Sequence, residues 1–171
     1  MLVGAGQAFA TGQRRCPNPD CNAHLFVVLD GGKVVISYPP ETIDFDTTNL
    51  PAGVLAALKE AVTCHATRCY VAAGIMVRKC LEELCDDRGA TGANLKDRIK
   101  GLGSTVVLPK ELLEGMDDLR LLGNDAAHIE SQVFKQVGSD EIELAIEVTK
   151  EVLKAVYQLS ALVEKLQKLK H

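Results

Sequence analysis

The chain has 171 residues, of which 47% are hydrophobic but only 4% aromatic, and it contains no tryptophan. A core of alanine, leucine, valine and isoleucine is typical of packed helices, and the length suffices for one domain with a small appendage. The net charge of −4 excludes a strong overall field that attracts nucleic acid. With no apolar run of about 18 residues and no secretory signal pattern, we expect a soluble cytoplasmic protein.

The N-terminal part is predicted to be a flexible lead over residues 1–13, followed by a β-hairpin lobe over residues 14–46. Two segments rich in β-branched residues, His24–Leu29 and Lys33–Tyr38, are separated by Asp-Gly-Gly at 30–32. Glycines in this position allow the positive φ angles of a tight hairpin turn. The sequence therefore predicts two paired strands in this lobe.

Two cysteines precede this hairpin in the pattern Cys16-Pro-Asn-Pro-Asp-Cys21, which resembles one knuckle of a zinc ribbon. Structural zinc takes four ligands. The second pair of ligands is expected at residues 39–46, where neither cysteine nor histidine occurs, while His24 could supply a third ligand. We therefore expect a degenerate, zinc-ribbon-like lobe without a cofactor. The alternative is a zinc ion bound by Cys16 and Cys21 and completed by other groups.

Residues 47–171 are predicted to form a mainly α bundle of about five helices. Pro51 and Pro109 suit first helical positions, Gly89 suits a helix end and Asn94 can cap a helix. The expected helices cover residues 51–64, 67–87, 95–101, 109–129 and 139–169.

Four further cysteines, Cys64, Cys69, Cys80 and Cys85, fall within these predicted helices. Small thiols are common in helical cores. In a chain of this size without an export signal, a disulfide framework is not expected. We therefore interpret these four residues as inert packing residues.

The last predicted helix has apolar residues at alternating steps of three and four, a seam of the coiled-coil type. Thirty residues make about 45 Å of helix, against about 30 Å for a small domain. This helix is therefore expected to join two copies in a homodimer. The alternative is a monomer in which the hairpin covers the extra length. The seam consists of Ile142, Ala145, Thr149, Val152, Val156, Leu159, Val163 and Leu166.

A polar stripe is predicted on the fourth helix, where Arg120, Asn124 and His128 are spaced four residues apart. Each such step turns the helix by only about 40°, so the three side chains share one face. The surrounding segment is apolar, and a polar stripe there needs either buried partners or a function. Gly123 costs about 1 kcal/mol in a helix and is tolerated where another backbone approaches closely.

A second polar pair, Arg78 and Glu82, is spaced four residues apart on the second predicted helix. One interpretation is a solvated surface pair, which contributes a few tenths of a kcal/mol. Because the residues around Arg78 are mostly apolar, the other interpretation is a partly buried guanidinium that bonds to a neighbouring helix. We treat Arg78 and Glu82 as candidate binding residues.

Residues Ala72–Glu83 and Leu119–His128 together resemble the domain of unknown function 4145 family, over roughly residues 16–165. The most specific parts are Arg78 with Glu82 and Gly-Asn-x-Ala-Ala-His at 123–128. This family is thought to be similar to HEPN domains, the helical domains of nucleotide-binding and defence proteins. The resemblance implies a helical bundle that often dimerises.

Many HEPN domains are metal-independent endoribonucleases whose motif is Arg, a polar residue, three further residues and His. By this resemblance His128 corresponds to the acid–base residue and Asn124 to the polar position. Gly123 occupies the position of the arginine, and Arg120 lies one turn earlier. Cleavage of RNA without metal needs a base, an acid and positive charge on the phosphate.

The sequence thus supports two functional hypotheses. The leading one is a non-catalytic, homodimeric interaction module tied to prokaryotic defence or nucleic-acid processing. The alternative is a metal-independent endoribonuclease with RNA as its substrate and His128, Asn124 and Arg120 as catalytic residues.

Overall fold

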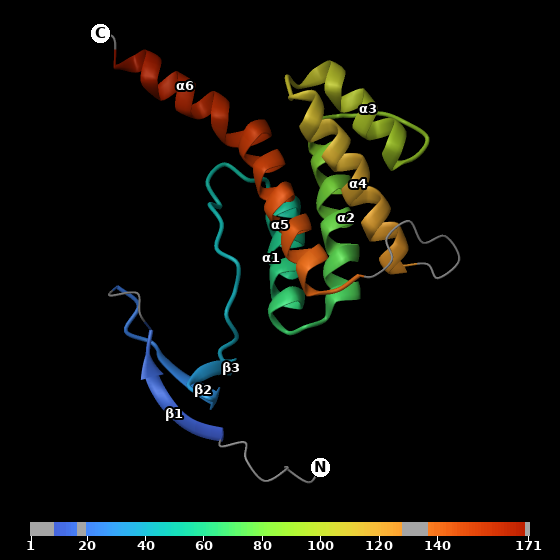
Figure 1. The fold of residues 1–171 in the computed structure, drawn as a ribbon. Coiled ribbons are helices and arrows are strands. Elements are labelled where there is room, and N and C mark those ends of the chain that lie inside the picture. Colours follow the sequence, from blue (N-terminus) through green and yellow to red (C-terminus); the bar gives the residue numbers. More distant parts are fainter. Residues whose placement is uncertain (1–8, 17–19, 128–136, 170–171) are drawn as a thin grey trace. The chain divides into compact units, whose positions relative to one another are not determined.

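The computed structural model describes residues 9–16, 20–127 and 137–169. The chain divides into two compact units, Met1–Thr42 and Ile43–His171. The first unit contains a three-stranded antiparallel sheet, and the second contains the six α-helices found among the described residues (Figure 1). The expected mainly α fold is confirmed.

The sheet of the first unit has the strand order β1-β2-β3. Strands β2 (His24–Asp30) and β3 (Lys33–Tyr38) form the predicted hairpin. Gly31 and Gly32 in its turn have φ angles of 54° and 84°, the left-handed region that glycine adopts without steric cost. The predicted turn chemistry is confirmed.

Strand β1 (Phe9–Arg15) differs from the expected flexible lead over residues 1–13. The strand pairs with β2 along its whole length, from Phe9 opposite Asp30 to Arg15 opposite His24. Its residues alternate neither in polarity nor in burial, since nearly all are exposed. The pairing therefore depends on backbone hydrogen bonds, which leave no hydrophobic period in the sequence.

The second unit is a helical bundle in which α2 is the central helix and contacts α1, α3, α4 and α5. Its core is aliphatic, with side chains such as Leu58, Leu81, Leu84, Met116 and Ile146 fully buried. The side chain of Asn94 accepts a hydrogen bond of 3.0 Å from the Asp97 N–H and caps α3 as predicted. The helices are α1 (Ala52–Ala66), α2 (Tyr70–Asp87), α3 (Leu95–Thr105), α4 (Lys110–Ala127), α5 (Ser139–Leu153), the π-helix η1 (Lys154–Gln158) and α6 (Leu159–Lys168).

Helices α1 and α2 are separate helices joined by a tight turn at Arg68, which has a φ of 63°. The N–H of Arg68 donates to the carbonyl of His65 (2.9 Å), and the N–H of Cys69 donates to the carbonyl of Cys64 (2.8 Å). These two crossed bonds around a left-handed residue define a Schellman motif. Helix α2 ends in the same way at Gly89, the predicted helix end.

The segment predicted as one helix over 139–169 is divided into α5, η1 and α6. The N–H of Leu159 donates to the carbonyl of Lys154, a step of five residues that marks the π-helical turn. The seam residues from Ile142 to Val152, before this turn, and Val156 within it are buried. After it, Leu159, Val163 and Leu166 are exposed. Among the described residues, no helix is both long and apolar enough to span a membrane.

Candidate functional site

Helices α2 and α4 approach each other closely at two glycines. A Cβ atom on Gly123 would lie 2.5 Å from the Cβ of Arg78 and 3.0 Å from the carbonyl oxygen of Gly74. A Cβ atom on Gly74 would lie 3.1 Å from the Cβ of Ala126. The predicted role of Gly123, to allow a close approach, is therefore confirmed.

This close approach brings Arg78 of α2 against Asn124 of α4. The Nε of Arg78 donates to Oε1 of Glu82 at 3.1 Å, and its Nη1 donates to Oδ1 of Asn124. About 29% of the Arg78 side chain and 32% of the Glu82 side chain are exposed. Arg78 is thus partly buried and bonds to a neighbouring helix, the second of the two interpretations drawn from the sequence.

Arg120 belongs to a different contact. Its Nε donates to Oδ1 of Asp117 at 2.7 Å, and only 12% of its side chain is exposed. This hydrogen bond, together with the charges of Arg120, Lys96 and Lys100, holds the pKa of Asp117 below its usual value. The Arg120 guanidinium is therefore paired with a carboxylate of its own helix.

The catalytic group predicted at Arg120, Asn124 and His128 stays a prediction, and its first two members have different partners. Asn124 bonds to Arg78 rather than sharing a partner with Arg120, and His128 lies outside the described residues. Arg78 and Asn124 are 46 positions apart, so no local spacing could indicate their contact. The useful signal was Gly123, since a glycine inside a helix indicates where a second helix approaches.

The cysteines of the first unit flank the connection between β1 and β2. The N–H of Cys16 donates to the carbonyl of Ala23 at 2.8 Å, while Cys21 is exposed. Within the described ranges, no cluster of three or more His, Cys, Asp or Glu side chains is arranged to hold a metal. Two thiols supply half of the four ligands that structural zinc takes.

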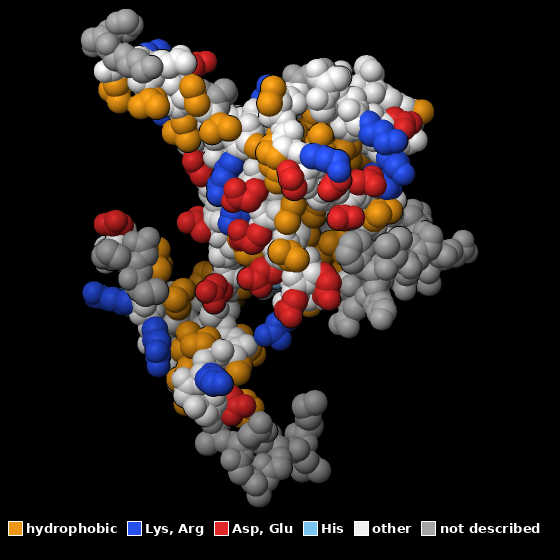
Figure 2. Space-filling model, turned by 45° about the horizontal axis from the view of Figure 1, so that its top comes forward, with side chains coloured by type: hydrophobic (Ala, Val, Ile, Leu, Met, Phe, Trp, Pro, Cys, Tyr) orange, Lys and Arg blue, Asp and Glu red, His pale blue; other side chains and the backbone are white. Residues whose placement is uncertain are grey.

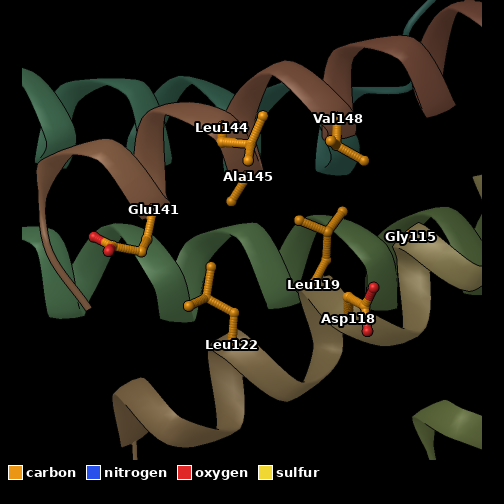
Figure 3. A pocket seen from close by; sticks show the side chains of 8 residues that line it. All are labelled: Gly115, Asp118, Leu119, Leu122, Glu141, Leu144, Ala145 and Val148. Carbon is orange, nitrogen blue, oxygen red and sulfur yellow. The ribbon is translucent and has the colours of Figure 1, made fainter. Parts of the chain in front are cut away.

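A groove lies between α4 and α5, and Figure 3 shows its lining. Leu119 and Leu122 of α4 face Ala145 and Val148 of α5 across a cavity of about 210 Å³. Carboxylates stand at its edges, and no lysine or arginine is found among the described residues that line it. The groove is thus apolar with an acidic rim. Its lining consists of Gly115, Asp118, Leu119, Leu122, Glu141, Leu144, Ala145 and Val148.

A second cavity, of about 640 Å³, continues this groove toward α6. On α4 the second cavity is lined by Leu112, three residues before Gly115 of the first cavity. On α5 it is lined by Glu151, three residues after Val148 of the first cavity. The two cavities therefore follow one another along the seam of α4 and α5. The second is lined by Leu112, Glu151, Lys154, Ala155, Gln158, Leu159 and Leu162.

Helix α6 carries four exposed apolar side chains, a fifth follows directly at its C-cap, and Figure 2 shows hydrophobic side chains along this helix. Among the described helices and strands, α6 contacts only η1. Spacings of three and four residues place the five on one face of the helix. We call them the α6 stripe: Leu159, Leu162, Val163, Leu166 and Leu169, which are 57%, 59%, 45%, 63% and 80% exposed.

Residues 59–170 match the model of a protein family described as a domain of unknown function, DUF4145. The match covers about two thirds of the chain and includes the Arg78 contact, the groove and α6. No curated protein and no solved structure matches the chain.

Proposed function

The chain belongs to DUF4145, a family of domains of unknown function, and we propose that this member is a non-catalytic interaction module that acts as a homodimer held by its C-terminal helix. The observation that carries the proposal is the exposure of the α6 stripe, which ranges from 45% to 80%. A contiguous exposed apolar surface of this kind is typical of an interaction site.

The lack of packing on α6 supports the same conclusion. The helix has 10 residues and contacts no described helix or strand other than η1. In proteins, most of the stability of a helical segment comes from the packing of its apolar face. A second copy that covers the α6 stripe would supply that packing.

The groove between α4 and α5 offers the complementary surface. Its walls are apolar, and its rim carries the carboxylates of Asp118 and Glu141. Helix α6 carries Lys165 and Lys168 against the single acidic Glu164, so it has a net positive charge. In the proposed dimer, α6 of each copy packs into this groove of the other. Such a reciprocal exchange gives a closed two-fold assembly.

The pairing of Arg120, the arginine of the endoribonuclease hypothesis, and of the candidate binding residue Arg78 favours the non-catalytic module. Arg120 is bonded to Asp117, and Arg78 is bonded to Glu82. Stabilisation of a cleaving phosphate requires positive charge directed at the substrate. Both guanidinium groups are instead paired with carboxylates of the protein. The link to prokaryotic defence or nucleic-acid processing is inferred from the resemblance to HEPN-like domains.

Sedimentation analysis over a range of concentrations tests the dimer. We expect the parent protein to be dimeric at micromolar concentration, and Leu166→Glu in the α6 stripe to be monomeric. The matched control is Val107→Glu, since Val107 is 99% exposed outside both surfaces and its substitution should leave the dimer intact. A parent protein that stays monomeric at about 100 μM would refute the proposal. At that concentration a dimer escapes detection only if its free energy of association is weaker than about −5.5 kcal/mol.

A charge exchange tests the receiving groove. Asp118→Lys should weaken the dimer by placing a lysine opposite the positive α6, and Lys165→Glu in the same chain should restore part of the affinity.

The non-catalytic assignment is tested with single-stranded RNA in EDTA. Cleavage by the parent protein that disappears in His128→Ala would show an endoribonuclease instead.

A further inference from the structure

The turn between α1 and α2 brings two thiols together. Cys64 is the first residue of the Schellman motif that ends α1, and Cys69, the third residue after Ala66, is the last. The N–H of Cys69 bonds to the carbonyl of Cys64 at 2.8 Å. In this motif the side chains at these two positions commonly contact each other across the turn. The left-handed Arg68, with a φ of 63°, closes the turn between them.

We propose that Cys64 and Cys69 form a redox-active thiol pair that is oxidised to an intramolecular disulfide by a small-molecule disulfide such as glutathione disulfide. The sequence interpretation as inert core residues does not hold for Cys69, which is exposed, whereas Cys80 and Cys85 are fully buried. Cys64 is half-buried beside it. The pair therefore has one thiol open to a reagent and a second thiol held next to it.

The electrostatics of the pair agree with this geometry. Partial burial, followed by the neighbouring charge of Cys69, raises the pKa of Cys64 above its usual value. A thiol whose pKa responds to another thiol lies near it. Cys69 in turn lies with its Sγ 3.8 Å from the carbonyl oxygen of Thr67, inside the same turn.

The more exposed thiol, that of Cys69, is expected to react first. The thiolate of Cys69 attacks one sulfur of glutathione disulfide, which forms a mixed disulfide and releases one glutathione thiolate. The thiolate of Cys64 then attacks the Cys69 sulfur and releases the second glutathione. Two protein thiols are oxidised, one glutathione disulfide is reduced to two glutathione molecules, and the two protons of the thiols pass to the released thiolates.

The test is a titration of the full chain in glutathione buffers of different ratio, quenched with an alkylating reagent and read by peptide mass spectrometry. We expect a linked Cys64–Cys69 peptide, with a loss of about 2 Da, one hydrogen from each thiol. The folded turn holds the two thiols together. The ratio of reduced to oxidised glutathione at which half of the pair is linked should therefore be at least about tenfold higher for the folded chain than for the chain in urea. Equal midpoints in the folded and unfolded chain would refute the proposal.

Two comparisons keep the result specific. Cys80 and Cys85 have the same spacing of five residues but lie within α2, and we expect both to be recovered as free thiols. Cys69→Ser, at an exposed position, should leave Cys64 alkylated rather than linked. Recovery of Cys64 and Cys69 as separate alkylated thiols, or their linkage to Cys16 or Cys21, at oxidising ratios would overturn the assignment.

Discussion

The hydroxyl of Tyr157 donates a hydrogen bond of 2.9 Å to the Oδ2 of Asp87 and thereby joins η1 to the C-terminal end of α2. The guanidinium carbon of Arg88 lies 4.2 Å from the centre of the Tyr157 ring. Tyr157 is buried, with 6% of its surface exposed. The π-helical turn is thus anchored to the central helix of the bundle.

Removal of this hydroxyl should destabilise the helical unit. We expect Tyr157→Phe to lower the free energy of unfolding by about 1 kcal/mol, the usual net contribution of a hydrogen bond. Urea denaturation followed by circular dichroism measures the change. Tyr38→Phe is the control, because Tyr38 is 73% exposed on the N-terminal sheet and its substitution should change nothing. Equal losses in the two variants would contradict this anchoring role.

Stability should decrease in alkaline solution because buried thiols resist ionisation. Burial, followed by the charge of Glu83, raises the pKa of Cys80 to about 12. Burial also raises the pKa of Cys85 to about 11. Above about pH 8.5 the thiols of the unfolded chain lose protons that the folded chain keeps, so the unfolded state is favoured as pH rises. Each thiol contributes a slope of up to about 1.4 kcal/mol per pH unit.

Denaturation between pH 8 and 11 in the presence of a reductant measures this slope. Cys80→Ala should reduce it, while Cys69→Ala, at an exposed position, should leave it unchanged. Above about pH 10, Tyr157 adds to the slope in the same direction, since its burial and its hydrogen bond to Asp87 raise its pKa. A stability that stays constant up to pH 11 would be inconsistent with these raised pKa values.

Replacement of two glycines of α4 by alanine should have opposite effects on stability, because α2 packs against one of them and the other has room for a methyl group. In Gly123→Ala the new methyl group would lie 2.5 Å from the Cβ of Arg78, so we expect a loss of about 1–3 kcal/mol from overpacking. In Gly115→Ala the nearest atom outside the helix, Cγ1 of Val148, is 3.4 Å away, and the higher helix propensity of alanine should add up to about 1 kcal/mol. Thermal unfolding of both variants measures the difference, and losses of equal size would disprove it.

The bond between Arg78 and Asn124 should appear as an energetic coupling. In a double-mutant cycle, Arg78→Ala and Asn124→Ala should deviate from additivity by about 1 kcal/mol in the free energy of unfolding. The control cycle pairs Asn124→Ala with Lys79→Ala, since Lys79 is bonded to Glu83 on the same helix. That cycle should be additive within about 0.5 kcal/mol. Additivity in both cycles would mean that the bond contributes nothing to folding.

Much of the helical unit could be predicted because its boundaries are encoded locally. Asn94 caps α3 and Gly89 follows α2, each by chemistry that involves only a few neighbouring residues. Strand β1 could not be predicted, because its pairing with β2 buries almost no side chain and leaves no period in the sequence.

The candidate site was predicted only in part, for a related reason. The spacing of Arg120 and Asn124 shows that they share a helix face, but their partners depend on how closely that helix approaches α2. Asn124 meets Arg78 because two glycines from distant parts of the sequence let the backbones approach. Such a contact is a property of the packed helices and cannot be read from either helix alone.

The π-helical turn between α5 and α6 has a consequence for how the C-terminal segment can change. A π turn contains about one residue more than an α turn, and each residue rotates the helix by about 100°. If the residues Lys154–Gln158 were wound as an ordinary α-helix instead, every side chain of α6 would turn by about that angle and its leucines would be redirected. The direction in which α6 presents its apolar side therefore depends on the extra residue of the π turn, and loss of one residue there, with return to an α turn, should leave the leucines facing the same way.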